Sequence, residues 1–467
     1  MKNNTRFLIF AFFILSAAFA GCSKKPDPGS KGPLTVHPDN PRYFTDADGR
    51  AVFVTGSHTW ANFQERGVEG ETPDFDYPRY LDFLHDFGHN FIRLWVWEHA
   101  QWMQFVSRET PVRYEPNPYM RTGPGQALDG GLRFDLTKFN PEYFERLRQR
   151  VDTAGQRGFY MSVMLFQGFS LSKTGGREQA GNAWHGHPFH LRNNINGIDG
   201  NPSGDDAGHE VHTLQVPEIT QLQKRYLAKV LDILNDCGNV LYEISNESQS
   251  GSVEWQYEMI RFIKEYESNK PQQHLVGMTG APIRNAELFA SPADWISPVG
   301  KEYLEDPPAA SGEKIVVVDT DHISPWSHDP VHVWKNFFRG NHFILMDSYM
   351  DFRMQSPAEP DSSYDDVRRA MGHARRLSER YDLAALVPEP SFSTTRYVLA
   401  GAGMLLIYQP GSGDFEVRIE QENEYRLTWI DPVTWEMTAA GGRDLERGSS
   451  AFTPPQPGAV ILVLEKQ

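Results

Sequence analysis

The chain has 467 residues, which exceeds one average domain and fits a large domain followed by a smaller one. Hydrophobic residues make up 39% of it and aromatic residues 12%, which is enough for a buried core and excludes a disordered chain. The formal net charge is -16, from 61 acidic and 45 basic side chains. Because such a charge repels phosphate backbones, we expect no nucleic acid among the partners of this protein.

The first 21 residues have the pattern of a secretion signal. Two basic residues precede the apolar run 7–19, which is too short to span a bilayer as a mature helix. An Ala-Gly-Cys sequence that ends at Cys22 follows, and it resembles a bacterial lipobox. The resemblance implies cleavage before Cys22, lipidation of its thiol and a polar tether over residues 22–33. We therefore expect a lipoprotein of the bacterial cell envelope, in the outer membrane or facing the periplasm, with the lipid as its only membrane attachment.

Eight apolar runs alternate with helical segments after this tether. A hairpin over residues 42–54 leads into a first strand that ends near 56–60. Further strands are expected at 90–97, 158–166, 240–246, 274–278, 295–298, 314–319 and 342–347, with helices at 80–88, 141–157, 217–236, 255–266, 331–338 and 364–380. Apolar strands that alternate with helices are typical of a parallel sheet covered on both faces. The count of eight predicts an α/β fold, a (β/α)₈ TIM barrel over residues 34–382.

From residue 383 the pattern changes to short alternating runs separated by turn residues. This pattern predicts a small antiparallel β-sandwich over residues 383–467. The segments 408–413, 428–434 and 452–455 resemble a C-terminal module, named a collagen-binding domain, that often follows apiosidase-like barrels. The resemblance leaves two roles open for it, a structural cap or an accessory carbohydrate-binding module.

The fourth predicted strand ends in an Asn-Glu pair, Asn246 and Glu247. Strand alternation puts Glu243, Ser245 and Glu247 on one face, with Asn246 on the other face or at the bend. The pattern resembles the fourth barrel strand of clan A glycoside hydrolases, of the cellulase-like kind. This resemblance implies that Glu247 is the general acid/base and that Asn246 orients a sugar hydroxyl. The structural alternative is an Asn that caps the next turn beside a solvated Glu.

Glycoside hydrolysis needs a second carboxyl group, about 5 Å from the first for retention and about 6.5–9.5 Å for inversion. The clan resemblance implies that it follows strand seven, which here runs into Asp319, Thr320, Asp321 and His322. The clan has Glu at this place, so the shorter Asp is a departure that leaves the retaining mechanism open. We favour Asp321 over Asp319 as the reacting group, with the other as its hydrogen-bonding partner. Alternatively, both acids cap the following turn.

Further polar and aromatic residues follow the predicted strands and suit a carbohydrate cleft, because aromatic rings stack on sugars and carboxylates accept hydroxyl protons. Arg93 in strand two resembles the clan arginine that fixes the nucleophile. The other candidate substrate-binding residues are His58, Trp60, Trp97, Glu98, His322 and Asp347. The histidines at 185, 187 and 190 could gather a metal or touch substrate, and we expect no metal or cofactor.

These features predict a glycoside hydrolase that cleaves a polysaccharide or oligosaccharide by two-carboxylate acid/base catalysis, with retention favoured. The rival hypothesis is a non-catalytic surface lipoprotein that binds polysaccharide or collagen, which the missing strand-seven Glu favours. A peptidase or esterase lacks support, because the chain has no His-Glu-x-x-His run and no Gly-x-Ser-x-Gly elbow.

Overall fold

The computed structural model describes residues 32–68, 75–102, 111–171, 182–323, 328–347, 349 and 360–467. The predicted signal segment and the predicted lipidation site at Cys22 lie outside these ranges. None of the helices within them is long and apolar enough to cross a membrane.

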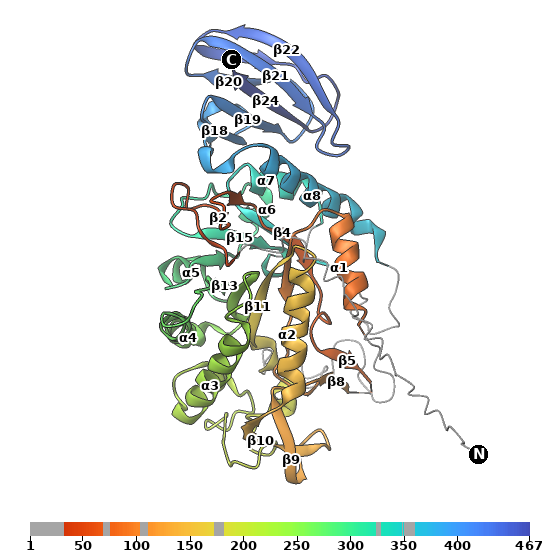
Figure 1. Ribbon diagram of the computed structural model, residues 1–467, viewed down its shortest axis with the longest axis vertical. Coiled ribbons are helices and arrows are strands. Elements are labelled where there is room, and N and C mark those ends of the chain that lie inside the picture. Colours follow the sequence, from red (N-terminus) through yellow and green to blue (C-terminus); the bar gives the residue numbers. More distant parts are fainter. Residues whose placement is uncertain are drawn as a thin grey trace, which may run out of the picture.

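The centre of the structure is a closed barrel of eight parallel strands, as the sequence predicts (Figure 1). In chain order these strands are β4 (Thr55–His58), β6 (Phe91–Leu94), β11 (Tyr160–Gln167), β12 (Val240–Asn246), β13 (Val276–Thr279), β14 (Trp295–Ser297), β15 (Ile315–Asp319) and β16 (His342–Met346). Strand β16 pairs with β4, which closes the ring. The strands are almost entirely buried because helices cover the barrel outside.

Helices connect these strands, and polar residues fix where several of them begin. The helices are α1 (Tyr77–Asp86), α2 (Pro141–Gly155), α3 (Pro217–Leu234), α4 (Val253–Glu267), α5 (Asn285–Ala290), α6 (Glu302–Glu305), α7 (Pro330–Phe337) and α8 (Asp365–Arg380). Helix α2 starts with a proline after Asn140, whose side chain accepts from the amide of Glu142. Asp329 caps α7 in the same way through the amide of Val331. The two short helices α5 and α6 were not predicted, because they lack a full amphipathic repeat.

An apolar layer fills the barrel at the amino ends of its strands. The predicted hairpin is present as β2 (Phe44–Thr45) and β3 (Ala51–Val52), and β1 (Thr35–Val36) pairs with β2. Phe44 from this sheet joins strand residues that include Leu241, Trp295 and Ile315 in one buried cluster. The ring of Trp295 occupies the space beside Gly277, where an added Cβ would lie 2.0 Å from it. The barrel is therefore closed at this end.

The segment between β6 and α2 forms an extension that the sequence patterns did not predict. It contributes β7 (Gln101–Trp102) and β8 (Val112–Glu115), which form a three-stranded sheet with β5 (Glu65–Gly67). Strands β9 (Tyr119–Gln126) and β10 (Leu132–Phe139) form a hairpin that projects at the lower end in Figure 1. The extension begins after the carboxyl end of β6 and ends where α2 begins, directly after β10. It therefore lies at the carboxyl ends of the barrel strands.

An antiparallel β domain follows α8, as predicted. One sheet has the order β17-β18-β19-β24-β21-β22, and β20 pairs with β23 in a second sheet. Their bounds are β17 (Val387–Pro388), β18 (Val398–Gly401), β19 (Met404–Gln409), β20 (Phe415–Ile419), β21 (Asn423–Ile430), β22 (Met437–Leu445), β23 (Gly448–Phe452) and β24 (Val460–Lys466). Phe415 and Phe452 of the small sheet pack with Trp429 and Leu462 of the large one in a separate core.

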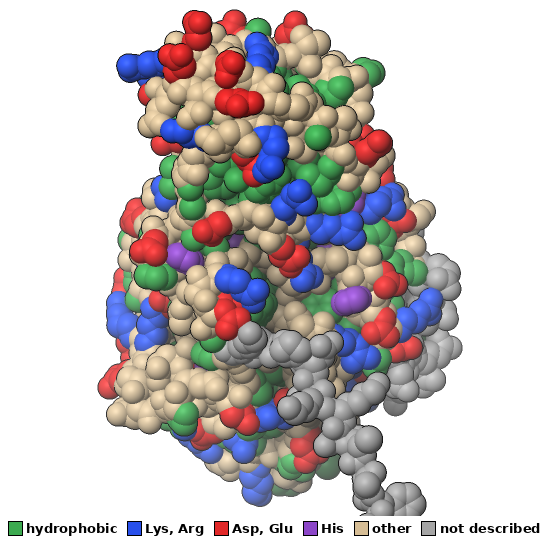
Figure 2. Space-filling model, turned by 45° about the horizontal axis from the view of Figure 1, so that its top comes forward, with side chains coloured by type: hydrophobic (Ala, Val, Ile, Leu, Met, Phe, Trp, Pro, Cys, Tyr) green, Lys and Arg blue, Asp and Glu red, His purple; other side chains and the backbone are tan. Residues whose placement is uncertain are grey.

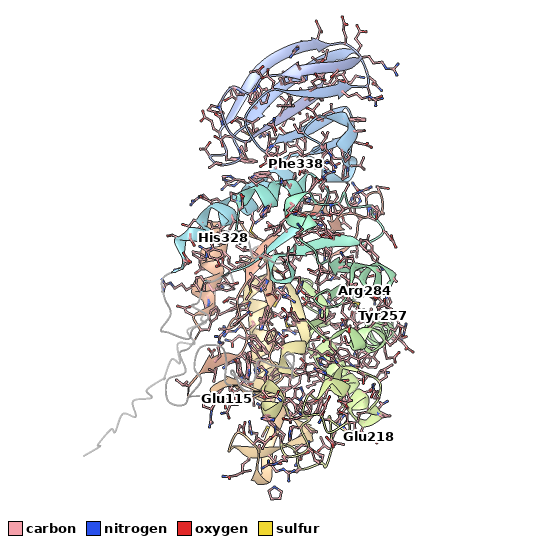
Figure 3. The ribbon with its side chains drawn as sticks, turned by 180° about the vertical axis from the view of Figure 1, so that it is seen from behind. Glu115, Glu218, Tyr257, Arg284, His328 and Phe338 are labelled. Atoms are coloured by element: carbon pink, nitrogen blue, oxygen red, sulfur yellow. The ribbon has the colours of Figure 1, made fainter. Side chains whose placement is uncertain are left out.

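The C-terminal domain also shares a core with the barrel helices. Tyr408 on β19 stacks on Phe338, with ring centroids 5.6 Å apart, and lies 6.1 Å from the ring of Trp334 on α7. His373 on α8 packs on Trp435, with ring centroids 5.3 Å apart. Figure 3 labels Phe338 at this junction, and Figure 2 shows apolar side chains gathered there while acidic and basic side chains are interspersed elsewhere on that face. The two domains therefore form one packed body.

Candidate active site

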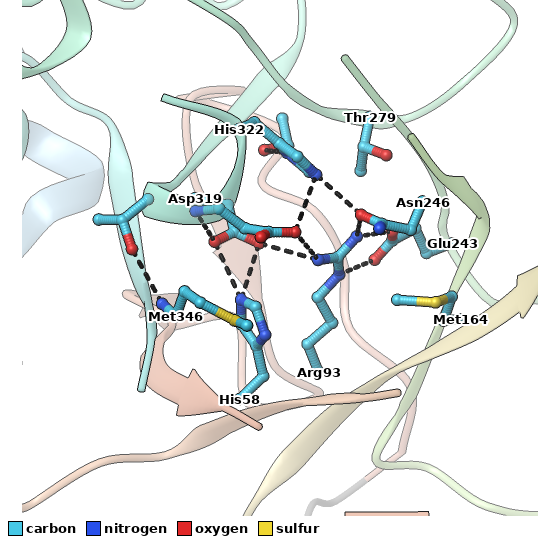
Figure 4. A network of polar contacts seen from close by, with 12 residues as sticks. His58, Arg93, Met164, Glu243, Asn246, Thr279, Asp319, His322 and Met346 are labelled. Carbon is cyan, nitrogen blue, oxygen red and sulfur yellow. Dashed lines mark hydrogen bonds and ion pairs between the residues drawn. The ribbon is translucent and has the colours of Figure 1, made fainter. Parts of the chain in front are cut away.

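The carboxyl ends of β6, β12 and β15 bring charged side chains together inside the barrel (Figure 4). Arg93 donates from Nε to Glu243 Oε2 at 2.8 Å and from Nη2 to Glu243 Oε1 at 2.5 Å. Its Nη1 donates to Asp319 Oδ2 at 3.2 Å, and its Nη2 also donates to Asn246 Oδ1 at 2.7 Å. One buried guanidinium group thus joins the second, fourth and seventh strands of the barrel.

Asp319, the last residue of β15, is held on both of its oxygens. Nε2 of His58 lies 3.0 Å from each oxygen, and the backbone amide of Asp321 donates to Oδ1 at 3.0 Å. Burial opposes ionisation, but the interactions with His58, Arg93 and His322 outweigh it and hold the pKa of the Asp319 carboxyl well below its usual range. Asp319 is therefore a firmly anchored carboxylate.

Asp321 lies in the 3₁₀ turn Thr320–His322, which Asp319 caps. Its Oδ2 is 3.4 Å from Arg93 Nη1 and 3.7 Å from His322 Nε2, so these contacts are longer than those of Asp319. The Asp321 side chain is 5% exposed and that of Asp319 is 1% exposed. Of the two strand-seven acids, Asp321 is therefore the one farther from the Arg93 guanidinium and the one with the more exposed side chain.

The side-chain amide of Asn246 has a fixed orientation. Its Oδ1 accepts from Arg93 Nη2 and, at 3.0 Å, from His322 Nε2, while its Nδ2 donates to Gln167 Oε1 at 3.1 Å. Ser297 Oγ lies 3.0 Å from the other ring nitrogen of His322, Nδ1. The network therefore runs from β11 through β12 to the turn after β15.

The chain bends at Glu247, directly after β12. Glu247 has a φ of 46°, in the left-handed region that residues with a Cβ rarely adopt, and its side chain is partly buried. Glu243 and Asn246 both contact Arg93, whereas strict alternation would put them on opposite faces. The alternation therefore fails before the end of the strand, and the bend gives Glu247 a direction that the alternation could not predict.

Glu98, a predicted substrate-binding residue, has its carboxylate engaged by protein groups. Oε1 accepts from the amide of Gln167 at 2.7 Å and lies 2.9 Å from His212 Nε2, and Oε2 lies 3.3 Å from His187 Nε2. Burial opposes ionisation here, but His212 and His187 hold the pKa of Glu98 well below its usual range. Glu98 thus connects the segment after β6 with the segment between β11 and α3.

The predicted aromatic residues form a cluster beside this network. His58 stacks on Trp95, with ring centroids 5.3 Å apart, and Arg93 lies over the same ring. Trp97 is 1% exposed, because Trp60 and other aromatic rings cover it. Trp60 is partly exposed, so of these two predicted tryptophans it is the more accessible to a ligand.

Asp347 is separated from the network by its own ion pair. Both of its oxygens accept from Arg368 on α8, at 2.9 Å and 2.5 Å, and neither side chain is exposed. This pair fastens α8 to the end of β16. Asp347 thus contacts Arg368 and stands apart from the charged network. The predicted site residues that the structure does bring together are Arg93, Asn246, His58, Asp319, Asp321 and His322.

Sequence patterns missed three members of the network: Glu243, Gln167 and Ser297. Each lies in a barrel strand, and the polar character of Glu243 within an otherwise apolar run was the available signal. His185 pairs with Asp206 near the surface, and His187 with Glu98. Among the described residues, no group of three or more His, Cys, Asp and Glu side chains is arranged to hold a metal ion.

The sequence matches one protein family in part. Residues 101–286, from β7 to the start of α5, match a domain of unknown function (DUF6298). No curated protein matches the chain.

The fold is similar to solved glycoside hydrolases. A structure titled glycoside hydrolase is 14% identical, with a TM-score of 0.61, and the match covers 93% of this chain and 97% of that chain. A glycoside hydrolase family 5 protein from Bacteroides vulgatus ATCC 8482 is 14% identical, with a TM-score of 0.63, covering 93% of this chain and 94% of that chain. The chain therefore has the TIM-barrel fold of glycoside hydrolases with a C-terminal antiparallel β domain.

Proposed function

We propose that this protein is a glycoside hydrolase that cleaves the O-glycosidic bonds of a polysaccharide or oligosaccharide with two carboxyl groups. The observation that carries the proposal is Arg93, which bonds Asn246, the neighbour of Glu247, and also contacts both strand-seven acids. These groups follow the carboxyl ends of parallel barrel strands, where barrel enzymes place their chemistry. The similarity of the fold to solved glycoside hydrolases also supports this proposed activity.

In this proposal the two acids have different tasks. Glu247 donates its proton to the glycosidic oxygen as the bond to the anomeric carbon breaks, and the leaving group departs as a neutral alcohol. Asp321 then bonds to the anomeric carbon, or it removes a proton from the water that does so. If a glycosyl ester forms, water attacks the anomeric carbon in the second step, its bond to Asp321 breaks to release the carboxylate, and Glu247 takes the proton from that water and returns to its acid form.

Asp321 is the better candidate for the reacting carboxylate, because Asp319 has both oxygens occupied by His58, Arg93 and the Asp321 amide. Asp319 orients Arg93 and fixes the turn that carries Asp321. Asp319 therefore positions Asp321 and adds a second negative charge beside Arg93.

The test is release of reducing sugar from a panel of plant, algal and bacterial polysaccharides and aryl glycosides. Wild type is compared with Glu247→Gln and Asp321→Asn, and the exposed-site variant Glu305→Gln is the control. Activity on one substrate that the first two variants lose by about 10²-fold or more supports the proposal. Release that survives both substitutions would overturn the assignment. If the wild type binds a glycan of the panel without cleaving it, the protein is a carbohydrate-binding protein.

We also propose that Cys22 carries the lipid that anchors this hydrolase to the bacterial cell envelope. The backbone of Gly32 packs against Gly238, because a Cβ added to Gly238 would lie 2.6 Å from the Cα of Gly32. Gly238 lies just before the amino end of β12. A tether that enters there would join the barrel at the end opposite Glu247, so that the site faces away from the membrane. Wild type should partition into detergent and Cys22→Ser into water on Triton X-114 phase separation. Wild type in the aqueous phase would contradict the anchor.

A further inference from the structure

The two residues that flank Glu247 in the chain are both linked to the same buried carboxylate. Glu98 Oε1 accepts from the backbone N–H of Gln167 at 2.7 Å, and the side-chain Oε1 of Gln167 accepts from Asn246 Nδ2 at 3.1 Å. The same Oε1 lies 2.9 Å from His212 Nε2, and His212 Nδ1 lies 2.9 Å from Ser248 Oγ. Two short hydrogen-bond paths thus start at Glu98 and end on either side of Glu247.

His212 is hydrogen-bonded at both of its ring nitrogens. Ionised Glu98 can only accept, so His212 donates to it from Nε2, and Nδ1 of the same ring bonds the Ser248 hydroxyl. Ser248 Oγ also lies 2.5 Å from Ser245 Oγ, so the two hydroxyl groups are hydrogen-bonded to each other. His212 is stacked on Trp255, with ring centroids 4.3 Å apart and an interplanar angle of 12°. The imidazole is therefore fixed in plane as well as at both nitrogens.

The backbone around Glu247 needs such support. Its φ of 46° lies in the left-handed region, which is unfavourable for a residue with a Cβ unless neighbouring contacts hold it. A Cβ added to Gly168 would lie 2.3 Å from the carbonyl oxygen of Glu247 and 2.6 Å from the Cα of Ser248. The backbone of the turn directly after β11 therefore packs against the bend from one side, while His212 contacts the Ser248 side chain.

We propose that Glu98, acting through His212 and Gln167, is the positioning residue that holds Glu247 in the conformation required for proton donation. This inference rests on the proposed function, in which Glu247 is the acid. It gives His212 a specific task, and through that residue it makes the 3₁₀ turn His209–His212 part of the machinery around Glu247. Neither Glu98 nor His212 touches the reacting atoms in this arrangement.

The first test needs no activity. Amide hydrogen exchange is measured by mass spectrometry over residues 243–252 in wild type, Ser248→Ala, His212→Gln and Glu98→Gln. The control is His274→Gln, because His274 and Glu267 form another buried His–Glu pair, at 2.8 Å, that lies before β13. We expect exchange at the bend to accelerate by about tenfold or more in the three variants and not in the control. Unchanged exchange in all three would overturn the proposal.

The second test separates proton donation from general damage, and it uses aryl glycosides of the sugar that wild type cleaves. A phenyl leaving group needs the acid, whereas a dinitrophenyl group departs without it. The three variants should lose about tenfold or more in kcat on the phenyl glycoside and about twofold or less on the dinitrophenyl glycoside. Equal losses on both would overturn the positioning role. If the proposed function itself is wrong, wild type will cleave neither glycoside. In that case the hydrogen-exchange measurement still tests whether Glu98 and His212 hold the bend at Glu247.

Discussion

Arg93 and Glu243 form a two-point ion pair within the barrel, with Nε to Oε2 at 2.8 Å and Nη2 to Oε1 at 2.5 Å. Both side chains are 1% exposed. The pair holds the guanidinium plane so that Nη1 faces Asp319 and Asp321. Glu243 therefore acts as a fixed counter-charge, and the geometry of the strand-seven acids depends on a carboxylate that takes no part in the proposed reaction.

Replacing Glu243 with Gln should destabilise the protein by about 3–5 kcal/mol, because the change leaves a buried guanidinium without its main counter-charge. Urea unfolding followed by tryptophan fluorescence measures this change. Glu305→Gln is the matched control, since Glu305 pairs with Lys301 at a site where both side chains are more than half exposed. That control should change the free energy of unfolding by less than about 0.5 kcal/mol. Equal changes in the free energy of unfolding for Glu243→Gln and Glu305→Gln would show that the buried Arg93 charge does not need Glu243 as its counter-charge.

Asp321→Asn and Asp319→Asn should have separable effects. The first should lower kcat by about 10²-fold or more and change the melting temperature less than the second, because the Asp321 contacts to Arg93 and His322, at 3.4 Å and 3.7 Å, are longer than those of Asp319. The second should lower both activity and stability, because it breaks the pair with His58. Differential scanning fluorimetry beside the sugar-release assay checks both. Full activity in Asp321→Asn would transfer the reacting role to Asp319.

His342 should make the protein less stable in mild acid. Burial lowers the pKa of His342 from 6.5 to about 3, so the folded protein keeps the ring neutral. The unfolded chain binds a proton below pH 6.5, so this part of the stability is present above pH 6.5 and is lost as the pH falls towards 3. The loss approaches about 1.4 kcal/mol per pH unit for this one group. Urea unfolding at several pH values between 7 and 4 should give a shallower slope in His342→Gln than in wild type.

The control for the His342 slope is His185→Gln, because the His185 side chain is 50% exposed and pairs with Asp206 at the surface. Its pH slope should match that of wild type. If His342→Gln keeps the full slope as well, other buried histidines such as His99, whose pKa burial lowers to about 3, carry the effect.

Tyr408→Ala should cost about 2–5 kcal/mol, because the ring packs on Phe338 and Trp334 in the core shared by both domains. Val433→Ala, at a side chain that is 62% exposed, is the control and should change little. Both are measured by urea unfolding. A chain cut after residue 382 should be insoluble or partly unfolded for the same reason. A stable, active barrel alone would show that the C-terminal domain is an independent module.

Much of the fold could be predicted because apolar runs and turn residues act locally. Strands β11, β12 and β15 were predicted nearly to their ends, and β14 was found within one residue although it is only three residues long. The extension between β6 and α2 was missed, because β7 and β8 are short and because β9 and β10 expose polar residues without regular alternation. Gly123 and Gly125 in β9 further obscure the alternation there.

The candidate site could be predicted only in part. Asn246, Asp319 and Arg93 follow from their positions at strand ends, and the structure does place them in one network. The pairing of Glu243 with Arg93 and that of Glu98 with His212 could not be inferred, because each joins residues over 100 positions apart. The direction of Glu247 was also hidden, since it depends on a left-handed residue where Gly would be expected.

The apolar layer around Trp295 and Leu241 lies directly beneath the charged network of Arg93 and fills the interior of the barrel. Among the described residues that layer leaves no passage through the amino end of the barrel, so under the proposed function a sugar and the product formed from it would share one opening. Product that has not yet left would then exclude the next substrate molecule. We therefore expect competitive product inhibition of the proposed reaction.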